Sequence, residues 1–227
     1  LGYGGYPGMQ RALQEMIRTR LTSVQRMEVG NDRISSLDVL PAVLQSDIEN
    51  IRSTMEENSR ESFNGAVDAI IKARRIYILG VRSSAAIASF MAFYFNLIFE
   101  NVKLISTNSA SEMFEQMLRV SPQDVVIAIS FPRYSKRTVQ AMRFSADMGA
   151  TVIAITDSPD SPLSGCAKHT LLARSDMVSF VDSLVAPMSL INALIVAVGR
   201  KNNEQLSQTF TALENIWEEY EVYEKIE

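Results

Sequence analysis

Serine and arginine side chains cluster where an apolar run gives way to a polar turn. In ILGVRSSAAIASF, Gly80 closes the run, and Arg82, Ser83 and Ser84 follow it. Backbone N–H groups at a helix start carry partial positive charge, and hydroxyl and guanidinium groups add further donors. This segment could bind an anion such as a phosphate. On spacing alone, a serine here could equally be only the N-cap of a helix.

A second such turn is AISFPRYSKRT, residues 128–138. Ser130 closes an apolar run, and Ser135 stands where a helix is expected to begin, with Thr138 just inside it. Pro132 has no backbone N–H, whereas Arg133 offers a planar fork of donors. The candidate ligand-binding residues of the chain are therefore Arg82, Ser83, Ser84, Ser130, Arg133, Ser135 and Thr138.

Two more turns follow apolar runs. The turn at 106–112, STNSASE, is rich in hydroxyl groups, whereas ITDSPDSPLS, with two prolines and two aspartates, is typical of a rigid structural loop. Ligands of a parallel sheet bind beyond the carboxyl ends of its strands. Hydroxyl groups at several neighbouring strand ends therefore predict one pocket for a polyhydroxylated anion, such as a phosphorylated sugar.

The elements that would position these turns alternate between short apolar runs and helical stretches. The runs are mostly β-branched and do not alternate with polar residues, which is typical of strands buried on both faces. The pattern predicts an α/β fold, with a parallel five-stranded sheet, helices on both faces and further helices before it. The expected strands are Arg75–Gly80, Val102–Ile105, Asp124–Ser130, Thr151–Thr156 and His169–Ala173, and the expected helices between them are Ser84–Phe99, Ser111–Arg119 and Ser135–Met148.

Helical spacing also marks both ends of the chain. A mildly basic helix is expected over Met9–Met27, and a polar linker over Gly30–Ser36. The narrow apolar stripe from Leu37 to Met55 fits a coiled-coil seam, a helix laid across a partner, or a helix packed on its own domain. Two long helices, Phe180–Arg200 and Asn203–Tyr223, are expected to close the chain.

Composition limits the classes of protein. The chain has 227 residues, 47% of them apolar, and a net charge of −4, which gives no global reason to bind nucleic acid. Its single cysteine, Cys166, excludes an internal disulfide and suits a reducing, cytoplasmic compartment. With His169 as the single histidine, a Cys/His zinc site is not expected, nor is a cofactor. The apolar run at 183–199 is too short to span a membrane, so a buried helix is expected.

The motifs together resemble the sugar isomerase (SIS) domain. Gly80–Ser84, then Ser130 with Ser135 and Thr138, then Ile155–Asp157 carry this resemblance. The stretch GYPGMQRALQEMIRTRL resembles the end of the helix-turn-helix domain of RpiR-type transcription regulators. ISFPRYSKRTV, ITDSPDSPLS and the Ser-Phe pair before DSLVAPMSLINAL are similar to the sensor domain of that family.

The resemblance implies a flavodoxin-like, doubly wound domain at 37–227, a linker at 30–36 and the remnant of a helix-turn-helix domain at 1–29. It implies a phosphosugar effector that modulates DNA binding by a domain largely missing here, and a homodimer or higher oligomer. Ser83 and Ser84 match the first phosphate-side loop, and Ser130, Ser135 and Thr138 match the second. The abrupt start at Leu1 suits the later part of a longer protein.

One turn departs from the family pattern. Phe131-Pro132-Arg133-Tyr134 stands where many relatives have a serine-glycine pair followed by threonine. Because Pro132 cannot donate a hydrogen bond, Arg133 is expected to replace a backbone phosphate cradle with side-chain donors. We interpret this turn as a sensing loop with an altered ligand preference. Loss of phosphosugar binding is the alternative.

Two other classes of function fit part of the sequence. A phosphosugar isomerase would need a base near the sugar carbons, and Glu112 is the best candidate, because the strand expected at His169 lies away from the main loops. An oligomerising module with an inactive pocket would use the same apolar helices. The regulator-like N-terminal stretch favours a sensor without catalytic residues.

Overall fold

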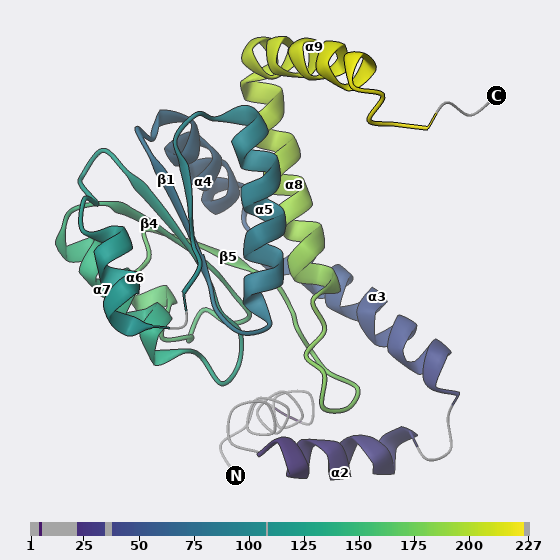
Figure 1. Ribbon diagram of the computed structural model, residues 1–227. Coiled ribbons are helices and arrows are strands. Elements are labelled where there is room, and N and C mark those ends of the chain that lie inside the picture. Colours follow the sequence, from purple (N-terminus) through teal and green to yellow (C-terminus); the bar gives the residue numbers. More distant parts are fainter. Residues whose placement is uncertain (1–4, 6–21, 35–37, 108, 225–227) are drawn as a thin grey trace.

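The computed structural model describes residues 5, 22–34, 38–107 and 109–224. A five-stranded, all-parallel sheet with the strand order β2-β1-β3-β4-β5 forms its centre (Figure 1). The strands are β1 Ile76–Gly80, β2 Val102–Ile105, β3 Val125–Ile129, β4 Thr151–Thr156 and β5 His169–Leu172. The predicted parallel sheet is confirmed, and each strand end lies within one residue of its predicted position.

Helices cover both faces of the sheet, as the unbroken apolar strands require (Figure 1). Successive residues of β1 point to opposite faces. Ile76 and Ile78 pack with α4 (Arg60–Lys72), α5 (Ser84–Ile98) and α8 (Val185–Lys201), whereas Tyr77 and Leu79 pack with α6 (Ala110–Met117) and α7 (Lys136–Asp147). The predicted helices α5, α6 and α7 are confirmed to within two residues at each end.

Two helices precede the sheet, α2 (Ser23–Ile34) and α3 (Val39–Glu57). Part of the predicted linker at 30–36 is helical, because α2 continues through Gly30 to Ile34. A glycine inside a helix costs only about 1 kcal/mol, which neighbouring turns can offset. Residues 9–21 of the predicted first helix, and Ser35, Ser36 and Leu37, lie outside the described residues.

The polar side of α3 faces the domain, and its apolar side faces outward. Asn50 and Thr54 are buried, whereas the large apolar side chains of the helix are exposed, namely Val39, Leu40, Val43, Leu44, Ile48, Ile51 and Met55. The helix packs on its own domain through this polar side, whereas the apolar stripe itself is left exposed. This arrangement is the reverse of that in an ordinary surface helix, where the apolar face is buried.

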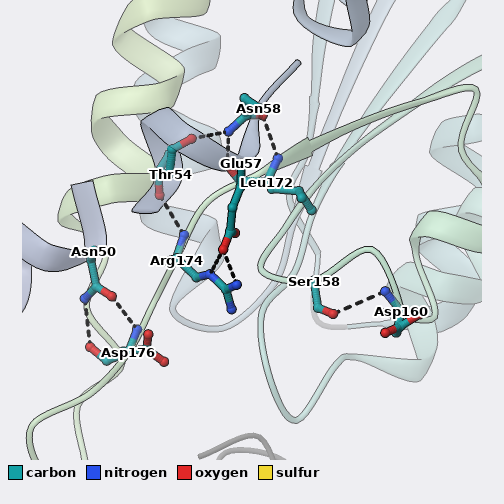
Figure 2. Close-up of polar contacts among 9 residues, drawn as sticks. All are labelled: Asn50, Thr54, Glu57, Asn58, Ser158, Asp160, Leu172, Arg174 and Asp176. Atoms are coloured by element: carbon teal, nitrogen blue, oxygen red, sulfur yellow. Dashed lines mark hydrogen bonds and ion pairs between the residues drawn. The ribbon is translucent and has the colours of Figure 1, made fainter. Parts of the chain in front are cut away.

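Side chains of α3 hold the chain that continues from β5 (Figure 2). Asn58 exchanges two hydrogen bonds with the backbone of Leu172, at 2.5 and 2.9 Å. Thr54 accepts from the N–H of Arg174 at 2.8 Å, and Asn50 exchanges bonds of 2.9 and 3.2 Å with Asp176. Because these groups occupy the free edge of β5, the sheet does not present an open edge there.

The last two helices differ from their predicted ends. α8 begins at Val185 instead of Phe180, and α9 (Asn203–Glu219) ends before Tyr223. Ser183 marks this late start, since its Oγ accepts from the N–H of Val185 at 3.3 Å and donates to Oδ1 of Asp47 on α3. Part of α8 is buried, as expected for the apolar run at 183–199. No helix in the described ranges is long and apolar enough to cross a bilayer.

Candidate ligand-binding site

A cavity of about 150 Å³ lies beyond the carboxyl ends of β1 and β3. These two strands are neighbours, but the chain leaves them in opposite directions. β1 leads through α5 to β2, whereas β3 leads through α7 to β4 on the other side. The two connections diverge and leave a crevice at this switch point, which is where open α/β sheets bind ligands.

Six of the seven predicted candidate residues line this cavity: Arg82, Ser83, Ser84, Ser130, Arg133 and Ser135. The seventh, Thr138, does not. It is fully buried in α7, and its Oγ1 has no hydrogen-bond partner among the described residues. Two of the four turns therefore converge on the cavity, and the described residues of the turns after β2 and β4 do not contribute to its lining.

The turn after β1 is shaped by a close approach between Gly80 and α5. A Cβ atom on Gly80 would lie 2.5 Å from the carbonyl oxygen of Ser84, so a side chain there would push the helix away. Ser83 occupies the N-cap position of α5 but makes no capping hydrogen bond. Ser84 is only 4% exposed, and no other described residue hydrogen-bonds to either hydroxyl. Both hydroxyls can therefore serve a ligand.

The turn after β3 is held by its own hydroxyl groups. The Oγ of Ser130 accepts from the N–H of Ser135 at 3.3 Å, and the Oγ of Ser135 accepts from the N–H of Thr138 at 3.4 Å, which caps α7. Tyr134 turns away and donates to Oδ1 of Asp157 at 2.9 Å. Phe131 is buried in the core beneath the cavity. The two serine hydroxyls keep their own O–H as a donor.

Four lining residues from outside the two turns were not among the predicted ligand-binding residues. Ser23 and Arg26 come from α2, and Phe180 and Asp182 come from the segment between β5 and α8. Arg26 is only 4% exposed, and its Nη1 donates to Oδ1 of Asp182 at 3.1 Å. Three arginines and one aspartate line the cavity in the described part of the chain, so its net charge is positive although that of the whole chain is negative. Such a site attracts anions.

The residues considered for catalysis lie elsewhere. Glu112 accepts a hydrogen bond from Thr107 and does not line the cavity, and His169 begins β5 at the opposite end of the sheet. Burial, with a smaller effect from Lys168, lowers the pKa of His169. Among the described residues, no three His, Cys, Asp or Glu side chains gather in a way that could hold a metal ion.

With this geometry established, comparison with known proteins identifies the domain. Residues 69–197 match the SIS domain family, which is more than half of the chain. The chain belongs to the SIS domain family. The match includes both turns that line the cavity, and it confirms the resemblance on which the sequence analysis relied.

The relatives of this SIS protein are transcription regulators. An uncharacterized HTH-type transcriptional regulator of Caldanaerobacter subterraneus is 26% identical over 87% of this chain and 71% of its own length. The sugar isomerase domain of an RpiR transcription factor from Sphaerobacter thermophilus has a TM-score of 0.74 and 26% identity, over 78% of this chain and 98% of that one. The NanR protein of Vibrio vulnificus, complexed with ManNAc-6P, has the same fold, with a TM-score of 0.68 and 18% identity over 95% and 77%.

Proposed function

We propose that this SIS protein is the sensor part of a transcription regulator. A phosphorylated sugar binds in the cavity between β1 and β3, and it modulates DNA binding by an N-terminal helix-turn-helix domain. Residues 1–29 are the end of that domain in this proposal. The observation that carries the proposal is the gathering of serine hydroxyls and arginines in one cavity at the switch point of the sheet. The regulator names of the relatives support it.

Different groups around the cavity would bind different parts of such a ligand. Arg82 and Arg133 supply positive charge, and Ser83 and Ser84 supply hydroxyl donors at the start of α5, where the helix dipole also favours an anion. Asp182 is an acceptor for sugar hydroxyls. The complex of NanR with ManNAc-6P supports this class of ligand, because a phosphorylated amino sugar combines an anionic group with several hydroxyls.

The geometry does not favour the isomerase alternative. Proton transfer between sugar carbons needs a base within hydrogen-bond reach of the substrate. Glu112 is bound to Thr107 outside the cavity lining. Asp182 is the one carboxylate among the described lining residues, and it is engaged in an ion pair with Arg26. A sensor without catalytic residues therefore remains our proposal.

The proposal is tested by thermal unfolding of the chain with a panel of aldose and ketose phosphates. At about 100 times its Kd, a ligand adds about 2.7 kcal/mol of stability, or a rise of roughly 5–10 °C in Tm for a domain of this size. Ser84→Ala removes one donor from the cavity, weakens binding about fivefold and removes about a third of that stabilisation. Ser207→Ala, an exposed serine of α9, is the matched control.

Two results would contradict the proposal. One is the absence of any Tm shift with every member of the panel, which would favour a module with an inactive pocket. The other is interconversion of aldose and ketose phosphates in the same mixtures, which would establish an isomerase. An equal ligand-induced shift in Ser84→Ala and wild type would refute only the assignment of Ser84.

A further inference from the structure

Helix α2 reaches the cavity although it lies outside the region that matches the SIS family. Figure 1 shows α2 beside the end of the loop that joins β5 to α8. Side-chain contacts with the domain hold it there. Nη1 of Arg133 donates to Oγ of Ser23 at 2.9 Å, and Nη1 of Arg26 donates to Oδ1 of Asp182 at 3.1 Å. All four of these residues line the cavity.

Arg26 differs from the other two arginines of the cavity in its burial and its origin. It is 4% exposed, and it is supplied by α2, a helix that precedes the region matching the SIS family. A guanidinium has five N–H donors in a planar fork, so Arg26 can bind Asp182 through one edge and a second anion through another. A buried arginine also binds an anion more strongly than an exposed one, since water screens the pair less.

We propose that Arg26 is an effector-contacting residue, so that the bound sugar phosphate joins α2 to the two SIS loops. The inference rests on the proposed function and adds a specific contact to it. Arg26 donates to the anionic group of the effector, whose other partners are the hydroxyls and arginines of the turns after β1 and β3. The sensor site is therefore completed by the helix that leads from the DNA-binding domain.

A consequence for regulation follows from this contact. A ligand shifts a conformational equilibrium only by the difference in its affinity for the two states. In a state with α2 away from the cavity, the effector would lack the contact with Arg26 and keep those with Ser84 and Ser130. The effector therefore favours the state in which α2 is docked, and reciprocally the docked state binds the effector more tightly.

The test measures the affinity of the chain for inorganic phosphate and for the panel of sugar phosphates, in three variants. Arg26→Met keeps an unbranched apolar stem and removes the charge, and we expect its affinity to fall about 10- to 100-fold. Arg26→Lys retains a charge and is expected to restore part of the affinity. Arg52→Met, on α3 and exposed, is the control and should bind like wild type.

A variant of Asp182 separates a contact with the effector from a purely structural role. Asp182→Asn breaks the ion pair but keeps the guanidinium of Arg26, and it removes a negative charge from the cavity. If Arg26 binds the anion, Asp182→Asn binds inorganic phosphate as well as wild type or more tightly. If Arg26 acts only by holding Asp182, both variants lose affinity to the same extent, and the inference is overturned.

Hydrogen exchange gives an independent measurement. Amide exchange in residues 23–34 should slow when the strongest ligand of the panel is added to wild type, and it should not slow in Arg26→Met. If wild type binds a ligand and Arg26→Met binds it equally well, this inference fails while the proposed function stands. If wild type binds neither phosphate nor any sugar phosphate, the proposed function fails and this inference fails with it.

Discussion

Two arginines at the cavity have backbone conformations that ordinarily favour glycine. Arg82 has φ 57° and Arg133 has φ 65°, both in the left-handed region. A residue with a side chain costs roughly 1–2 kcal/mol there. Both positions directly follow the two strand ends that form the crevice. Glycine would relieve this strain, but it would also remove a positive charge from the cavity. The two arginines are therefore better explained by anion binding than by a contribution to stability.

At the other end of β3, one buried carboxylate anchors the strand. Asp124 accepts hydrogen bonds from Nε and Nη2 of Arg74 at 3.1 and 3.0 Å, and from the N–H and Oγ of Ser121, both at 2.9 Å. Burial by itself would raise the pKa of Asp124, but the hydrogen bonds from Arg74 and Ser121 outweigh it, and the net shift is downward. The ionised form is therefore favoured by folding.

This shift predicts a stability that depends on pH. Because the folded pKa is depressed, the contribution of Asp124 is complete above the unfolded value of about 4 and is lost as the pH falls through the folded value. Asp124→Asn should lower the free energy of unfolding by about 2 kcal/mol at pH 7, and by less below pH 4. Urea unfolding at both pH values, with the exposed Asp147→Asn as control, measures this. A difference that does not change with pH would contradict it.

At the scale of elements, the contact between α3 and the end of β5 depends on matching repeats. Asn50, Thr54 and Asn58 are four residues apart, which is about 6 Å along a helix. Their backbone partners at 172, 174 and 176 are two residues apart, which is about 6.6 Å along an extended chain. The near match lets one side of α3 and its C-cap Asn58 bind three alternate positions of the chain at and beyond the end of β5, as Figure 2 shows.

This contact predicts that removal of one polar side chain, that of Asn58, lowers the stability of the domain substantially. Asn58→Ala leaves the N–H and the C=O of Leu172 without these partners and should cost about 2–3 kcal/mol of stability. For a domain of this size, Tm would fall by roughly 4–12 °C. Gln45→Ala, an exposed change on the same helix that removes a contact with Glu49, should leave Tm within about 2 °C. Equal Tm values in the two variants would show that the contact with β5 is not stabilising.

At the scale of the whole molecule, the outward apolar face of α3 requires a partner surface. Leu40 is 67% exposed and Met55 is 73% exposed, at opposite ends of one stripe. Contiguous apolar patches of this kind mark interaction sites on soluble proteins. We expect a second copy of the chain to cover the stripe, in line with the homodimer that the family resemblance implies.

The expected outcome is a dimer that depends on this stripe. Sedimentation or light scattering should give twice the mass of one chain for wild type. The double variant Leu44→Glu, Ile48→Glu places charges in the centre of the stripe, so it should shift the mass toward one chain. Leu118→Glu alters an apolar residue that is 70% exposed and lies outside α3, and it should not. A wild-type monomer, or a dimer that the double variant does not affect, would refute this expectation.

The sequence alone determined the sheet and two of its turns. The strands β1, β3 and β4 are unbroken apolar runs, because both of their faces are covered, and this pattern can be read locally. Six of the candidate ligand residues follow directly from it, since in a parallel sheet the turns after neighbouring strands meet at one edge. Thr138 was predicted as a ligand-binding residue, but it does not line the cavity. Its side chain is buried in α7, which helical spacing did not reveal.

Only the tertiary structure decided which other residues meet at the cavity. Arg26 and Asp182 are 156 residues apart, and nothing in the local sequence of either one signals the other. The helix predicted from Phe180 starts at Val185, where Ser183 accepts from the N–H of Val185 and donates to Asp47 of α3, a contact between distant segments. Local propensity and periodicity report on neighbours along the chain, whereas these contacts depend on how α2, α3 and the β5–α8 segment pack in space.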